Sequence, residues 1–139
     1  MALPEKRQHN QASWLAAWGP AAIWGLVISY ASAILIGPET YPFVPFGDKL
    51  FHLGEYVVFG YLLHFGAKRR SWPAGWPTWW RLLIPIVLIS FINEWHQAFV
   101  PTRFPDERDM LADLIGGLVG ILGFAWELRR AAQAKAVQP

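Results

Sequence analysis

The stretch that decides the fold is FINEWHQAFVPTRFPDERDMLADLIGGLVG, which runs from Phe91 to Gly120. Apolar residues dominate both of its ends, which is typical of helices that cross a bilayer. Between these ends lie polar and charged side chains, namely Asn93, Glu94, His96, Gln97, Arg103, Asp109 and Asp113. An isolated charge at the centre of a membrane helix costs about 2.5 to 3.5 kcal/mol. The stretch therefore predicts polar side chains that face other helices rather than lipid.

The composition of the whole chain favours a single membrane domain. Of the 139 residues, 54% are hydrophobic and 16% are charged, and nine are tryptophans, which gather at membrane interfaces. Cysteine is absent, so the chain has no disulfide framework, no thiolate metal site and no cysteine nucleophile. The formal net charge is only +2, and no basic stripe follows a polar face, so nucleic acid is not an expected partner.

Four apolar segments predict an all-α fold, an integral membrane four-helix bundle, because only helices can span a bilayer with so few segments. They occupy residues 14–36, 50–67, 82–100 and 110–128. These segments define a transmembrane domain over residues 14–128, with an N-terminal tail at 1–13 and a C-terminal tail at 129–139. Gly37-Pro38 is expected to end the first helix, RRSWPAGWPTWWR (69–81) to separate the second from the third, and Pro85 to lie near the start of the third.

Loop charges predict the orientation, because cytoplasmic loops carry the excess of Lys and Arg. Basic residues flank the start of the first segment, separate the second from the third and follow the fourth, whereas the other two loops are rich in acids. Both termini should therefore be cytoplasmic. An alternative is that the first segment is a cleavable signal peptide with Ala31-Ser32-Ala33 at the cut. Its apolar run continues past that point, which favours a spanning helix.

This orientation brings the unusual polar residues of three segments to the outer side. Residues three and four apart share a helix face, so each segment should present one polar face. The three faces are His52, Glu55 and Tyr56; Asn93, Glu94 and Gln97; and Asp109, Asp113, Gly116 and Gly120. We expect them to line an outward-facing polar pocket together with Asp48 and Lys49, with Arg103 as the principal counter-ion of the carboxylates.

Each feature also has a plainer interpretation. The carboxylates could simply hold the helices together, and Gly116 and Gly120 are typical of close helix packing. His52 and Glu55 with Glu94 or Asp113 could bind a metal, but this spacing arises often by chance, so no metal or other cofactor is predicted. His96 and His64 are expected at the membrane interfaces. Ser29, Ser32 and Ser90 have no evident His and acid at matching depth, so nucleophilic catalysis is not expected.

The motifs DKLFHLGEY (48–56), NEWHQAF (93–99), PTR (101–103) and DMLADLIGGLVG (109–120) resemble those of the VanZ-like family of small bacterial membrane proteins. One departure is Asp113, where family members commonly have Asn. The family is named after a protein linked to teicoplanin resistance, so the resemblance implies a role in the cell envelope, in the bacterial cytoplasmic membrane. It implies no general biochemical activity.

Together these observations predict a multi-pass membrane protein whose pocket binds the head group of a lipid or lipid-linked envelope precursor. The expected ligand-binding residues are Asp48, Lys49, His52, Glu55, Tyr56, Asn93, Gln97, Arg103 and Asp109. An alternative is an intramembrane hydrolase or transferase that acts on such a lipid, with Glu94 and Asp113 as catalytic residues. A further alternative is an accessory subunit whose polar cluster docks a membrane protein partner.

Overall fold

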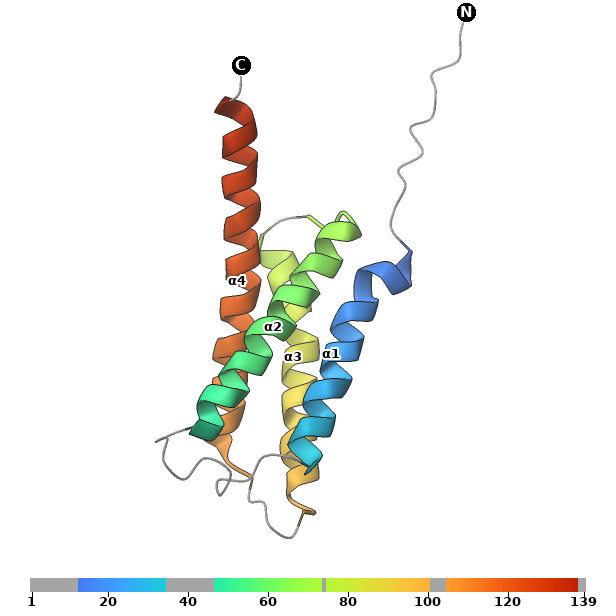
Figure 1. Ribbon diagram of the computed structural model, residues 1–139, viewed down its shortest axis with the longest axis vertical. Coiled ribbons are helices and arrows are strands. Elements are labelled where there is room, and N and C mark those ends of the chain that lie inside the picture. Colours follow the sequence, from blue (N-terminus) through green and yellow to red (C-terminus); the bar gives the residue numbers. More distant parts are fainter. Residues whose placement is uncertain (1–12, 35–46, 74, 101–104, 138–139) are drawn as a thin grey trace, which may run out of the picture.

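The computed structural model describes residues 13–34, 47–73, 75–100 and 105–137, which form four α-helices in a bundle (Figure 1). They are α1 (Trp14–Ile34), α2 (Gly47–Arg69), α3 (Trp76–Gln97) and α4 (Glu107–Val137). The all-α prediction is confirmed. The end of α1, the start of α2, the end of α3 and the start of α4 lie at one end of the bundle (Figure 1). We call this end the acidic end.

The predicted start of the third helix was wrong. Helix α3 begins at Trp76, so WPTWWR belongs to the helix, and Pro85 lies in its interior rather than near its start. Pro77 occupies the first turn instead, where a missing backbone N–H is tolerated. Helix α4 continues to Val137, through most of the expected C-terminal tail. The expected stop at Gly37-Pro38 lies outside the described residues.

Glycines bring α2 and α4 into backbone contact. A Cβ placed on Gly116 would meet the carbonyl oxygen of Leu53, and one placed on Gly120 would meet that of Val57. Gly60 makes the reciprocal approach to the backbone of Gly117. The packing interpretation of Gly116 and Gly120 is therefore confirmed, because no larger side chain fits between two backbones this close. This contact fixes which faces of α2 and α4 oppose each other.

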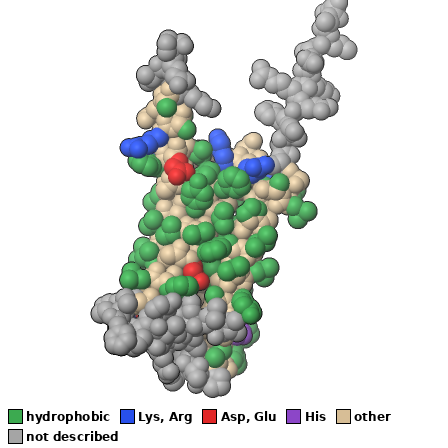
Figure 2. All heavy atoms as spheres, viewed as in Figure 1, with side chains coloured by type: hydrophobic (Ala, Val, Ile, Leu, Met, Phe, Trp, Pro, Cys, Tyr) green, Lys and Arg blue, Asp and Glu red, His purple; other side chains and the backbone are tan. Residues whose placement is uncertain are grey.

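The core is apolar in the middle of the bundle, and so is much of its outer surface. Tyr56, Phe59, Ile86 and Ile121 are among the side chains that are almost completely buried. Many large apolar side chains nevertheless lie exposed along the helices, and they cover most of the visible face in Figure 2. Two spans, Trp14–Ala33 and Glu107–Ala134, are long and apolar enough to cross a membrane.

Candidate functional site

Three helices contribute buried polar side chains to the acidic end. His52 comes from α2, Asn93, Glu94 and Gln97 come from α3, and Asp109 and Asp113 come from α4; none of these six is more than 7% exposed. Each helix thus turns the face expected from its spacing toward its neighbours. The structure brings together most of the residues that the sequence singled out, and their contacts divide them into distinct groups.

Among the described residues, Lys49 is the Lys or Arg that pairs with the carboxylates of the cluster. Its Nζ lies 2.8 Å from Asp109 Oδ1, 2.9 Å from Asp106 Oδ2 and 3.1 Å from Asp48 Oδ2. Because these contacts join the start of α2 to the start of α4, they close the bundle at this end. Arg103, which was expected in this role, lies outside the described residues.

Asp106, which was not among the predicted site residues, connects three elements. Its Oδ1 accepts a hydrogen bond from the backbone N–H of Arg108 (2.9 Å), which caps α4. Its backbone N–H donates to Glu94 Oε2 (2.9 Å), and its other carboxylate oxygen holds Lys49. The hydrogen bond from Lys49 lowers the pKa of Asp106, and the capping bond adds to this effect. The available signal was an N-cap Asp placed just before an apolar helix.

Asp113 uses both carboxylate oxygens inside the cluster. Oδ1 lies 3.0 Å from His52 Nδ1, and Oδ2 accepts a hydrogen bond of 2.7 Å from Ser90 Oγ. The expectation that Ser90 lacks an acid and a histidine at its depth was therefore wrong. The carboxylate stands between the serine and the histidine, however, so His52 cannot act as a base on Ser90, and the order required of a nucleophile is not met.

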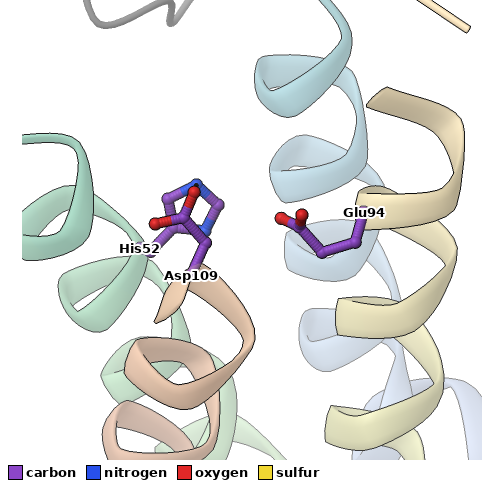
Figure 3. A group of neighbouring side chains, drawn as sticks. All are labelled: His52, Glu94 and Asp109. Carbon is purple, nitrogen blue, oxygen red and sulfur yellow. Dashed lines mark ion pairs between the residues drawn. The ribbon is translucent and has the colours of Figure 1, made fainter. Parts of the chain in front are cut away.

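Glu94 has an oxygen without a partner in the described part of the chain. Its side chain is only 5% exposed, Oε2 accepts the bond from Asp106, and Oε1 is buried with no hydrogen-bond partner among the described residues. Figure 3 shows the carboxylate pointing from α3 toward His52 and Asp109. One ligand atom from each of these three residues lies within 4.8 Å of the others. A buried carboxylate oxygen normally has a donor or a cation as its partner.

The remaining predicted ligand residues on α2 and α3 serve the packing in this structure. Asn93 Nδ2 donates to the Tyr56 hydroxyl (3.4 Å), and Gln97 Nε2 donates to Ser32 Oγ (2.8 Å), which ties α3 to α1. Glu55 is half-buried, and its backbone carbonyl accepts a hydrogen bond from Trp24 Nε1 (2.9 Å). Asn93 and Gln97 therefore act as polar contacts between helices in this structure.

The two histidines expected at the membrane interfaces differ. His96 is exposed, as predicted. His64 is not: it is only 6% exposed, and its Nδ1 lies 2.8 Å from the carbonyl oxygen of Ile121 on α4. Its ring also packs against Phe124, with 5.0 Å between the ring centroids. The position of a residue along a helix did not indicate its facing direction, so the prediction for His64 was wrong.

The fold and the site define a class: a small all-α protein with two helices able to span a membrane and an acid-rich polar cluster at one end. The VanZ/LLP1 family model matches residues 5–128, which is most of the chain. The chain belongs to this family, and the resemblance to VanZ-like proteins is confirmed. Comparison with curated proteins and with solved structures found no match.

Proposed function

We propose that all four helices cross the bacterial cytoplasmic membrane, with both termini in the cytoplasm and the acidic end outside. The apolar outer surface supports membrane insertion, since large exposed apolar patches need a nonaqueous neighbour. The opposite end supports the orientation, because Arg and Lys gather there (Figure 2). Four described guanidinium groups at this basic end lie over aromatic rings. The distances to the ring centroids are 5.3 Å for Arg69 and Phe65, 4.7 Å for Arg70 and Trp14, 5.7 Å for Arg81 and Trp72, and 3.8 Å for Arg130 and Trp126.

At the outer face, the cluster binds the head group of a lipid or a lipid-linked envelope precursor. The observation that carries this proposal is the buried Oε1 of Glu94, which has no hydrogen-bond partner in the ranges that the structure describes. Leaving such an oxygen unsatisfied costs about 1 to 3 kcal/mol or more, so a ligand that supplies its partner gains a corresponding advantage. Lipid head groups are present at this depth of the membrane, and family membership points to the cell envelope.

The described residues change the expected chemistry of recognition. Lys49 was expected to bind the ligand, but its ammonium group is already held by three carboxylates. The described part of the site is therefore anionic, and it favours the hydroxyl or amine groups of a head group over a bare phosphate. Asn93 and Gln97 can bind a head group only by giving up their hydrogen bonds to Tyr56 and Ser32.

Lipid binding by the purified, delipidated protein tests this function. Native mass spectrometry would compare phosphatidylethanolamine and a polyprenyl phosphate, with phosphatidylcholine as the head group that lacks N–H and O–H donors. We expect Glu94→Gln to weaken binding of the recognised lipid by at least about tenfold, because removing the partner of a charged, buried group costs roughly 1.5 to 3 kcal/mol.

The matched control is Glu127→Gln at the other end of the bundle, where the exposed carboxylate bonds only the Tyr61 hydroxyl among the described contacts. This variant should bind lipid like the unaltered protein. Equal affinity of Glu94→Gln and Glu127→Gln for every lipid tried would refute the proposal.

A second candidate is an enzyme that acts on such a lipid. The same oxygen favours it, since a buried carboxylate oxygen with no hydrogen-bond partner among the described residues can accept a proton. Asp113, the other proposed catalytic residue, has both oxygens bonded to His52 and Ser90. In this mechanism Glu94 would transfer the proton, and Asp113 would hold His52 in position.

A further inference from the structure

Three unused ligand atoms converge at the acidic end. His52 Nδ1 is engaged by Asp113, which leaves Nε2, and Asp109 Oδ1 is engaged by Lys49, which leaves Oδ2. These two atoms face each other at 4.0 Å. Glu94 has a buried oxygen, Oε1, with no hydrogen-bond partner among the described residues, and Figure 3 shows its carboxylate turned toward the other two side chains. Each of the three residues thus contacts its own neighbours with one atom and keeps a second ligand atom available.

We infer that His52, Glu94 and Asp109 bind a divalent transition-metal cation, zinc by the nature of the donors. One imidazole nitrogen and two carboxylate oxygens are ligands that zinc accepts at about 2.0 to 2.2 Å. At these lengths two ligands of a tetrahedral ion lie about 3.4 Å apart. The ligand atoms of the three residues lie within 4.8 Å of one another, so binding of the ion would draw them closer together. The nitrogen donor favours zinc over magnesium or calcium.

The surroundings of His52 fit a metal ligand. A histidine that binds metal through one ring nitrogen donates the N–H of its other nitrogen to a carboxylate or carbonyl group. Asp113 Oδ1 can accept a hydrogen bond from His52 Nδ1, and Ser90 Oγ in turn donates to Asp113 Oδ2. These contacts hold the His52 ring with Nε2 toward the site. This role also accounts for the acid at position 113. A carboxylate accepts a hydrogen bond from the His52 ring more strongly than the side-chain amide of Asn would.

Charge balance supports a cation at the same point. Among the described residues, Lys49 is the only Lys or Arg in ion contact with the cluster's carboxylates, and it already serves Asp48, Asp106 and Asp109. Glu94 and Asp113 have no such partner within the described part of the chain. A divalent ion would offset this excess of negative charge, which a low-dielectric surrounding makes costly.

This inference deepens the proposed function and rests on it in one respect. Zinc with three protein ligands keeps an open coordination position. With zinc bound, Glu94 would be a metal ligand, so a head-group oxygen would meet the site at this open position instead of donating a hydrogen bond to Glu94 directly. The metal site itself requires no lipid, so the two proposals can be tested separately.

The test uses full-length protein without a histidine tag, stripped with a chelator and kept in lipid-free detergent. Zinc chloride is titrated by equilibrium dialysis with elemental analysis, and magnesium chloride serves as the comparison. We expect one zinc per chain and no saturable magnesium binding. Glu94→Gln should weaken zinc binding by more than tenfold, and Asp113→Asn by about 10- to 100-fold through loss of the support of His52. His96→Gln, which removes an exposed histidine, should leave binding unchanged.

A readout on the unaltered protein covers the case in which a variant fails to fold. Saturating zinc should raise the Tm of the stripped protein, since a ligand that binds only the folded state stabilises it, and cobalt should give the visible absorption of a bound ion. Absence of saturable zinc binding in the folded protein, or equal affinity in Glu94→Gln, would overturn the metal site. Lipid binding without zinc binding would contradict the metal site and support head-group recognition. Zinc binding without lipid binding would contradict head-group recognition and support the metal site.

Discussion

Replacing Lys49 with Met is expected to lower the free energy of unfolding by about 3 kcal/mol. The ammonium group holds three carboxylates, and Asp109 is only 6% exposed. Removing one partner of a buried ion pair leaves an uncompensated charge, which costs about 3 to 5 kcal/mol. The lower end of this range applies because 18% of the Lys49 side chain is exposed. Methionine keeps the apolar part of the side chain, so the loss of stability can be assigned to removal of the positive charge.

The matched control is Lys68→Met in the last turn of the same helix, where the side chain is exposed. This change should alter stability by no more than about 0.5 kcal/mol. Thermal unfolding in one detergent, followed by circular dichroism, compares both variants with the unaltered protein. Equal stability of Lys49→Met and Lys68→Met would mean that Lys49 does not hold the helices together.

Replacing Gly120 with Ala is expected to destabilise the bundle by about 1 to 3 kcal/mol, the cost of overpacking a close interface. The added Cβ would meet the carbonyl oxygen of Val57 and would lie 2.7 Å from the backbone nitrogen of Tyr61. Because both obstacles are backbone atoms, no side-chain rotation can relieve them, and α2 must move away from α4. The polar cluster would lose its alignment at the same time.

Gly123 provides the control on the same helix, since a Cβ there meets nothing within 4 Å. Gly123→Ala should leave stability unchanged or raise it by up to about 1 kcal/mol, the difference in helix propensity. The same unfolding measurement separates the two outcomes. If both alanine variants were equally stable, the backbone contact between α2 and α4 would be contradicted.

The sequence predicted the parts of this molecule that follow from periodicity within one helix. The polar faces of α2, α3 and α4 and the close approach at Gly116 and Gly120 follow from three- and four-residue spacing. Partners between helices did not follow, because they depend on how each helix is rotated against its neighbour. Lys49 bound three carboxylates, and Ser90 reached Asp113, neither of which was expected.

His64 illustrates the same limit. Its place near one end of α2 suggested an interface, whereas the rotation of the helix directs it to the backbone of α4. Asp106 was overlooked for a different reason: it was counted as one of several loop acids, although its position just before Glu107 marks it as a helix cap. Reading caps and charges together would have identified this residue.

The proposed function requires that the acidic end face the outside of the membrane. Because the chain contains no cysteine, single cysteines can be introduced at Glu107 and Ala131, exposed positions near the two ends of α4. A membrane-impermeant maleimide applied to intact spheroplasts should label Glu107→Cys at once and Ala131→Cys only after permeabilisation. The reverse pattern would place the cluster at the cytoplasmic face, and labelling of both in intact spheroplasts would contradict a membrane-spanning α4.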